Sequence, residues 1–101
     1  MSETELEEFL ILRNLDEPIP EQAFEAAAEG AMEVLQDLTD EGVGIEWVKS
    51  TTRTQADGAI TGTFCQYRAE NEEALREHAV RAGLPVTRID LHGKTLESGA
   101  R

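Results

Sequence analysis

The sequence predicts an α+β fold, with two helices on one face of a four-stranded antiparallel sheet. Two stretches carry apolar side chains at helical spacing, and four short stretches are rich in aliphatic, β-branched or aromatic residues. These stretches follow one another in the order β-α-β-β-α-β. An Asp-Gly pair lies between the two middle strands, and such a pair between strand-like runs is a strong local signal of a β-hairpin.

The first part of the chain predicts one strand and one long helix. Residues 8–13, EFLILR, form an apolar run of strand length without a helical period. The next segment, NLDEPIP, is predicted to be a loop whose last residue, Pro20, suits the first position of a helix. Apolar side chains then recur at helical spacing over residues 24–38, with acidic side chains on the other faces. Gly42 is expected to end this helix.

The second part predicts a hairpin, a second helix and a last strand. The hairpin strands are residues 45–54 and 60–67, both rich in β-branched and aromatic residues. Asn71 can cap the second helix, which we expect to end at Gly83. Residues 86–91 then form the last strand.

The order of elements corresponds to the ferredoxin-like split βαβ plan. We expect a single ferredoxin-like domain over residues 7–92, because a chain of 101 residues is of single-domain size. An acidic tail, residues 1–6, precedes it, and a flexible polar tail, residues 93–101, follows it.

The hairpin loop decides which side chains share a face of the sheet. If Asp57 and Gly58 alone form the loop, Ala56 pairs with Ala59, and antiparallel partners lie on the same face. One face then carries Val48, Ser50, Thr52, Thr63, Cys65 and Tyr67. The other carries Trp47, Lys49, Thr51, Phe64, Gln66 and Arg68. The first set is smaller and uncharged, so we expect the helices to cover it; a longer loop would swap the two faces.

This register predicts a homodimer. It leaves Trp47 and Phe64 on the open face of the sheet, where exposed apolar surface is unfavourable by about 25 cal/mol per Å². A second copy of the sheet is the simplest cover. We therefore expect two chains to pack sheet to sheet through this face.

The charge balance excludes several partners. The chain has 21 acidic and 9 basic residues, a net charge of -12 and a pI of about 4.4. Such a surface repels phosphates, so we expect neither nucleic acid nor a membrane as a partner. The acid-rich, lysine-poor usage is similar to that of salt-adapted haloarchaeal proteins, and an ordinary acidic protein is the alternative. No apolar run approaches the ~18 residues of a membrane span, and the acidic start is unlike a signal peptide, so we expect a cytoplasmic protein.

Three side chains are candidates for chemistry, and each also has a structural interpretation. His78, on the apolar stripe of the second helix, could bind a metal or carry a proton, or pack beside the sheet. Cys65 is the single cysteine, so it cannot form an internal disulfide; it could be a soft ligand, a nucleophile or a small buried apolar residue. Tyr67 shares its face. No metal, phosphate or nucleophile motif accompanies them, and no catalytic residue is nominated.

Three segments carry a resemblance to a known family. They are Trp47-x2-Ser50, Phe64-Cys65-x-Tyr67-x-Ala69, and the helix from Glu72 to Pro85 that contains His78, Ala79 and Gly83. Over residues 44–91 the chain resembles a widespread family of small ferredoxin-like proteins of unknown function. Some members of that family are described as nickel-binding, and its members look like dimers. The resemblance therefore implies a dimer associated with a divalent metal such as nickel.

The chain departs from the pattern at two places. The family's tyrosine after the serine is Thr51, and nickel-binding members have histidines at the end of the first strand, where this chain has Arg13, Asn14 and Leu15. Cys65 and His78, the remaining candidate ligands, are too few for a closed nickel site.

Three functions stay open. The first is a dimeric protein that binds a metal ion or small ligand, with the candidate site Trp47, Ser50, Phe64, Cys65, Tyr67 and His78. The second is an enzyme of the dimeric α/β-barrel type with a cavity over the Trp47 and Phe64 face, by analogy of fold alone. The third is an accessory interaction module without a site of its own.

Overall fold

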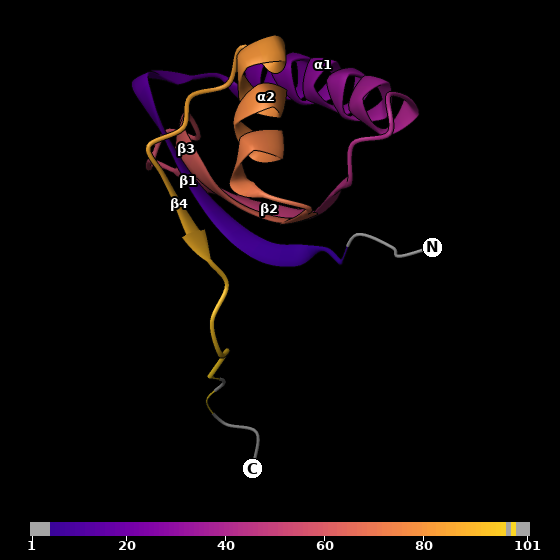
Figure 1. The fold of residues 1–101 in the computed structure, drawn as a ribbon. Helices are drawn as coiled ribbons and strands as arrows, with labels where there is room; N and C mark the ends of the chain where they lie inside the picture. The colour runs from indigo at the N-terminus through magenta and orange to yellow at the C-terminus, as the bar shows by residue number, and fades with distance from the viewer. Residues whose placement is uncertain (1–4, 97, 99–101) are drawn as a thin grey trace.

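The computed structural model describes residues 5–96 and 98, and it has the predicted ferredoxin-like α+β fold (Figure 1). Its elements are β1 (Glu7–Ile19), α1 (Glu21–Asp40), β2 (Ile45–Thr54), β3 (Ile60–Ala69), α2 (Glu72–Ala82) and β4 (Arg88–Leu91). The predicted tails, residues 1–6 and 93–101, lie partly outside the described residues. Neither helix in the described part of the chain is long and apolar enough to cross a bilayer.

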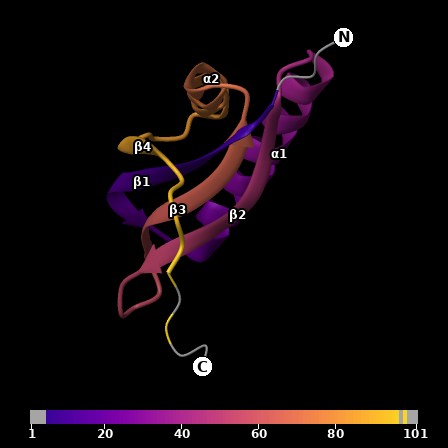
Figure 2. The same ribbon diagram turned by 60° about the horizontal axis from the view of Figure 1, so that its bottom comes forward.

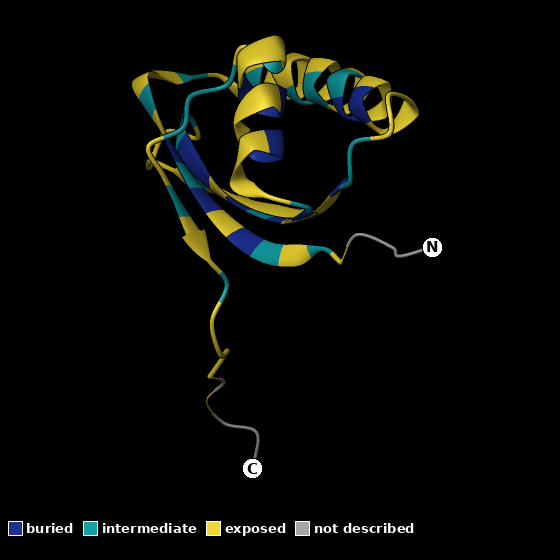
Figure 3. Cartoon of the chain, in the orientation of Figure 1, coloured by how far each residue is buried: buried dark blue, intermediate teal, exposed yellow. Residues whose placement is uncertain are grey.

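The four strands form one antiparallel sheet in the order β2-β3-β1-β4. Both helices lie on one face of this sheet, and the other face is bare (Figures 1 and 2). The core lies between the two layers, and Figure 3 marks buried residues on β1, β3 and the helices. It is built on Phe9, Ile11, Leu38, Ile45, Tyr67 and Leu75. Burial of these apolar side chains is the main stabilising contribution.

The first strand is longer than predicted. β1 continues to Ile19, so the segment NLDEPI belongs to the strand and is not a loop. Its pairing with β3 is irregular there: Asn14 pairs with Gly62, and the next paired residue is Ile19, opposite Ile60. Pro18 lies in this unpaired stretch, which suits a residue without an N–H group.

The ends of α2 follow the predicted signals, whereas Pro20, expected at the first position of the first helix, is the residue before α1. The side chain of Asn71 accepts a hydrogen bond of 2.8 Å from the Ala74 N–H at the start of α2. Gly83 ends this helix with a φ of 70°, in the left-handed region that favours glycine.

The hairpin loop differs from the prediction. The loop has three residues, 56–58, because the closing hydrogen bond joins the Gln55 N–H to the Ala59 oxygen at 2.9 Å. Gly58, with a φ of 94°, completes the turn, as is usual for hairpins of this length. The prediction that Ala56 pairs with Ala59 is therefore wrong.

Two register shifts in the pairing of β2 with β3 then decide the faces. The first, between Arg53 and Thr54, restores the predicted register, so Ser50 lies opposite Cys65. The second leaves Val48 without a partner and places Trp47 opposite Tyr67. Such an extra residue is a β-bulge, and it reverses the alternation of side chains beyond it. Trp47 consequently lies on the helix-facing side of the sheet, and the prediction that it lies on the open face is wrong.

Candidate functional site

A pocket lies between α1 and the helix-facing side of the sheet, and its volume is about 380 Å³. Most of its wall is apolar: β1 and α1 contribute Ile19, Phe24, Ala28, Ala31, Met32 and Leu35. The side chains of β2 border it at the edge of the sheet, where Trp47 remains 44% exposed. The pocket is therefore open to solvent at the β2 edge of the sheet.

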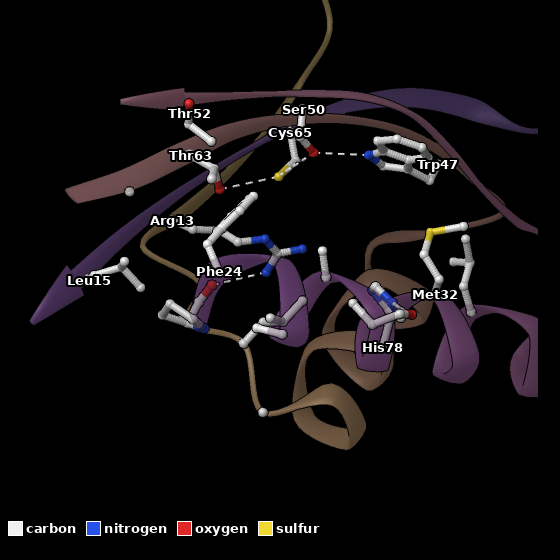
Figure 4. A pocket seen from close by; sticks show the side chains of 18 of the residues that line it. Arg13, Leu15, Phe24, Met32, Trp47, Ser50, Thr52, Thr63, Cys65 and His78 are labelled. Carbon is white, nitrogen blue, oxygen red and sulfur yellow. Dashed lines mark hydrogen bonds between the residues drawn. The ribbon is translucent and has the colours of Figure 1, made fainter. Parts of the chain in front are cut away.

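A chain of hydrogen bonds runs along the sheet side of the pocket (Figure 4). The indole Nε1–H of Trp47 donates to Ser50 Oγ at 2.9 Å, and Ser50 Oγ donates to Cys65 Sγ at 3.0 Å. Thr63 Oγ1 lies 3.3 Å from the same sulfur. These bonds hold the indole ring in place and satisfy the polar groups of the wall.

His78 is buried between the two helices and the sheet, with 1% of its surface exposed. Its Nε2 lies 2.9 Å from the backbone oxygen of Ala31, and because a carbonyl only accepts, Nε2 carries the proton. Nδ1 has no hydrogen-bond partner among the described residues. Burial lowers the pKa of His78, the Ala31 hydrogen bond opposes that shift, and the Arg13 charge adds to it. The imidazole is thus a neutral group with a free lone pair.

Arg13 extends from β1 into the space between the sheet and the helices (Figure 4). Its Nη1 donates to the Pro85 oxygen at 2.9 Å, and its Nη2 donates to the Tyr67 hydroxyl at 3.4 Å. Burial raises the pKa of Tyr67, and the Arg13 charge opposes this effect. The phenol therefore stays protonated near neutral pH.

The structure brings five of the six predicted site residues together. Trp47, Ser50, Cys65, Tyr67 and His78 all line the pocket. The sixth, Phe64, lies on the opposite face of the sheet with 52% of its surface exposed.

Sequence reasoning did not predict the remaining residues of the pocket, among them Arg13, Phe24 and Met32. A signal for the first was present. In β1 the side chains of Phe9, Ile11 and Arg13 follow one another at a spacing of two, which places the arginine on the core face.

The pocket does not fit a nickel ion held by this chain alone. The described residues contain no group of three or more His, Cys, Asp or Glu side chains that could hold a metal. Cys65 and His78 do line one pocket, but Arg13 lines it too, and its positive charge opposes the binding of a cation.

The fold and the pocket together define a small ferredoxin-like protein with a ligand-sized cavity under its helices. The sequence model of the family described as "Nickel responsive protein SCO4226-like" matches residues 9–91, so the chain belongs to this family. The chain is also similar to the crystal structure of SCO4226 from Streptomyces coelicolor A3(2), with a TM-score of 0.68 and 15% sequence identity. That similarity covers 88% of this chain and 99% of the Streptomyces chain, and it supports the fold. No curated protein matches the chain.

Proposed function

We propose that this protein binds a small organic molecule in the pocket between α1 and the sheet. The cavity of about 380 Å³ is the observation that carries this proposal. Ligand sites are typically concave and mostly apolar, with a few fixed polar groups and volumes of about 300–1,000 Å³. This pocket has the same character, with polar groups supplied by Arg13, Ser50 and His78.

Trp47 provides a direct readout, because it is the single tryptophan of the chain and it lines the pocket. N-Phenyl-1-naphthylamine is a neutral apolar probe that fluoresces in apolar surroundings and accepts energy from a nearby indole. We expect saturable energy transfer from Trp47 to this probe in the wild-type protein.

Two variants of the same helix test whether the probe occupies the pocket. Ala28→Phe fills the cavity, so it should weaken probe binding at least about 10-fold. Ala26→Phe, which adds the same ring at an exposed position outside the pocket, should leave binding unchanged. Absence of saturable binding, or equal effects of the two variants, would contradict the proposal.

We also propose that the protein is a homodimer that pairs through the bare face of the sheet. Phe64 and Leu10 are exposed on this face. Trp47, which was predicted to lie on this face as well, lies on the opposite face. The register also places on the bare face Lys49, Arg53, Arg68 and Arg88, together with Glu8, Glu46 and Asp90. Charges are therefore nearly balanced on this face, whereas α1 carries six acidic residues and no basic ones. Two strongly acidic chains repel each other least through such a surface.

Sedimentation tests this assembly. We expect a dimer at micromolar concentration, and we expect Phe64→Glu to shift it to a monomer. Val80→Glu adds the same charge at an exposed position of α2 and should leave the dimer intact. A monomeric wild-type protein would contradict the proposal.

A second candidate function is the binding of a divalent transition metal, which the family's nickel-responsive description supports. The free Nδ1 of His78 is the group best suited to it, and the remaining ligands would have to come from outside the single chain. Calorimetric titration with Ni²⁺, Cu²⁺ and Zn²⁺ tests this candidate on the wild-type protein and on His78→Ala. If no metal binds, or if metal binds equally well to His78→Ala, this candidate function is wrong.

We also propose that the protein works in a salt-rich cytoplasm of the haloarchaeal kind. Its net charge of -12 supports this proposal, since dense carboxylates keep a protein soluble in concentrated salt. The dependence of stability on salt, set out below, provides the test.

A further inference from the structure

Arg13 is a buried charge for which the structure supplies no opposite charge. Its side chain lies in the protein interior, with 4% of the residue exposed. No carboxylate in the described part of the chain lies within 4.0 Å of its guanidinium, whereas Arg68, Arg76, Arg81 and Arg88 each pair with at least one. This contrast stands in a chain with 21 acidic residues.

Burial of such a charge is costly unless something compensates for it. An arginine cannot escape the cost by losing its proton, because the guanidinium stays charged at any pH a protein tolerates. A guanidinium has five N–H donors, and the two hydrogen bonds to Pro85 and Tyr67 reach neutral oxygens. Buried charges in proteins are normally paired, so this one lacks its usual partner.

The wall of the pocket isolates this charge further. Its lining in the described chain contains neither Asp, Glu nor Lys, so Arg13 is the one permanently charged side chain there. The same pocket is lined by apolar side chains of α1, among them Phe24, Ala28 and Met32. The pocket therefore combines a single fixed positive charge with an apolar cavity.

From this arrangement we infer that the pocket takes an organic anion, whose carboxylate or sulfonate group pairs with the Arg13 guanidinium and whose apolar body lies against α1 and Trp47. The planar guanidinium matches the two oxygens of such a group and forms strong, charge-assisted hydrogen bonds. This inference rests on the proposed ligand-binding function and names the chemical class of the ligand. The net charge of -12 disfavours anions elsewhere on the surface, so selective binding must come from Arg13.

A matched pair of probes tests the inference on the folded chain. 8-Anilinonaphthalene-1-sulfonate carries a sulfonate, and N-phenyl-1-naphthylamine has nearly the same aromatic body without it. We expect Arg13→Met to weaken binding of the sulfonate at least about 10-fold, the loss typical of a hydrogen bond to a charged group, and to change binding of the neutral probe less than about 2-fold. Arg76→Met removes the same charge from the exposed surface of α2 and should alter neither.

A measurement on the wild-type protein covers the case in which Arg13→Met does not fold. 4-Phenylbutyrate and its neutral amide are compared as competitors of N-phenyl-1-naphthylamine. We expect the carboxylate to displace the probe at a concentration at least about 10-fold lower than the amide does.

The outcomes separate the two proposals. Equal displacement by carboxylate and amide, or equal weakening of both probes in a folded Arg13→Met, would contradict the inference that the ligand is an anion. The proposal that the pocket binds a small molecule would stand. Failure of the neutral probe to bind the wild-type protein at all overturns the ligand pocket and the anion with it.

Discussion

Nε2 of His78 in α2 lies 2.9 Å from the backbone oxygen of Ala31 in α1, so one imidazole ring joins the two helices. The contact crosses 47 residues of sequence and lies where both helices meet the sheet. Tyr67 packs against the same ring, with the two ring centroids 5.7 Å apart. The ring is thus part of the interior and not a surface group.

This environment predicts that acid destabilises the fold. The pKa of His78 is lowered in the folded chain from its ordinary value of 6.5, chiefly by burial. The unfolded chain therefore binds a proton more readily than the folded one, and the free energy of unfolding falls as the pH drops below about 6.5. The stability that the neutral ring contributes is fully present above that pH. Urea unfolding at several pH values between 7.5 and 5.5 measures the slope.

Substitution locates the group responsible. His78→Gln removes the titrating ring and retains an amide that can donate to Ala31, so it should flatten the slope. His92→Gln, at the end of the sheet, is the control and should keep it. Glu41 and Asp57 have lowered pKa values because Arg81 and the Ala59 N–H, respectively, hydrogen-bond their carboxylates, so they titrate below this window. An unchanged slope in His78→Gln would contradict the assignment.

Replacement of Gly30 should stabilise the protein. This residue lies inside α1 on an exposed surface, and a Cβ added there meets no atom within 4 Å. Gly30→Ala should raise the free energy of unfolding by about 0.5–1 kcal/mol, because alanine loses less backbone entropy in a helix. Gly58→Ala is the control: its φ of 94° is strained for alanine, so stability should fall. Thermal unfolding of both variants should show a higher melting temperature for Gly30→Ala and a lower one for Gly58→Ala.

Gly62 should tolerate no side chain. A Cβ at this position would meet the backbone oxygen of Arg13 in β1 and the guanidinium of Arg53, which crosses β3 to hydrogen-bond that oxygen and the Asn14 side chain. Gly62→Ala should cost about 1–3 kcal/mol of stability in urea unfolding, as overpacking usually does. Adding Arg53→Ala should recover only part of the loss, because the backbone oxygen cannot move without the strand. Full recovery would show that the guanidinium alone causes the conflict.

Salt should stabilise the protein through α1. Glu21, Glu25, Glu29, Glu33 and Asp37 form one exposed row at a spacing of four residues, and like charges at this spacing destabilise a helix by about 0.2–0.5 kcal/mol per pair. Raising KCl from 50 mM to above 1 M screens this repulsion, so the melting temperature should rise. A melting temperature that does not depend on salt would contradict both the mechanism and the proposed salt adaptation.

A single substitution in the row separates local repulsion from general salt effects. Glu29→Gln removes two of the repulsive pairs and should stabilise the protein in low salt by about 0.4–1 kcal/mol. Its melting temperature should also depend less on KCl. Glu77→Gln is the matched control, because it removes an attractive pair with Arg81 at 2.7 Å and should not stabilise the protein.

Much of the fold was accessible from local signals. Each of these signals depends on residues close together in sequence: the helical period, the Asn71 cap, the glycines at the helix ends and the Asp-Gly turn. Each predicted helix and strand is present in the structure. β1 was predicted too short because Pro18 reads as a break. It lies in a strand segment whose pairing is irregular and so needs no N–H donor there.

The site was less accessible, because it depends on two register shifts between β2 and β3. The sequence by itself determined which elements form, how they are ordered, that Cys65 and Tyr67 share one face of the sheet, and that His78 lies on the apolar stripe of its helix, since periodicity specifies these features. Which face the helices cover stayed open, because a longer hairpin loop would exchange the two faces. Only the tertiary structure decided that Val48 is bulged, that Trp47 turns toward the helices, and that Arg13 meets it in one pocket. The physical reason is that a one-residue shift between strands reverses every side chain beyond it, and cross-strand pairing selects that shift.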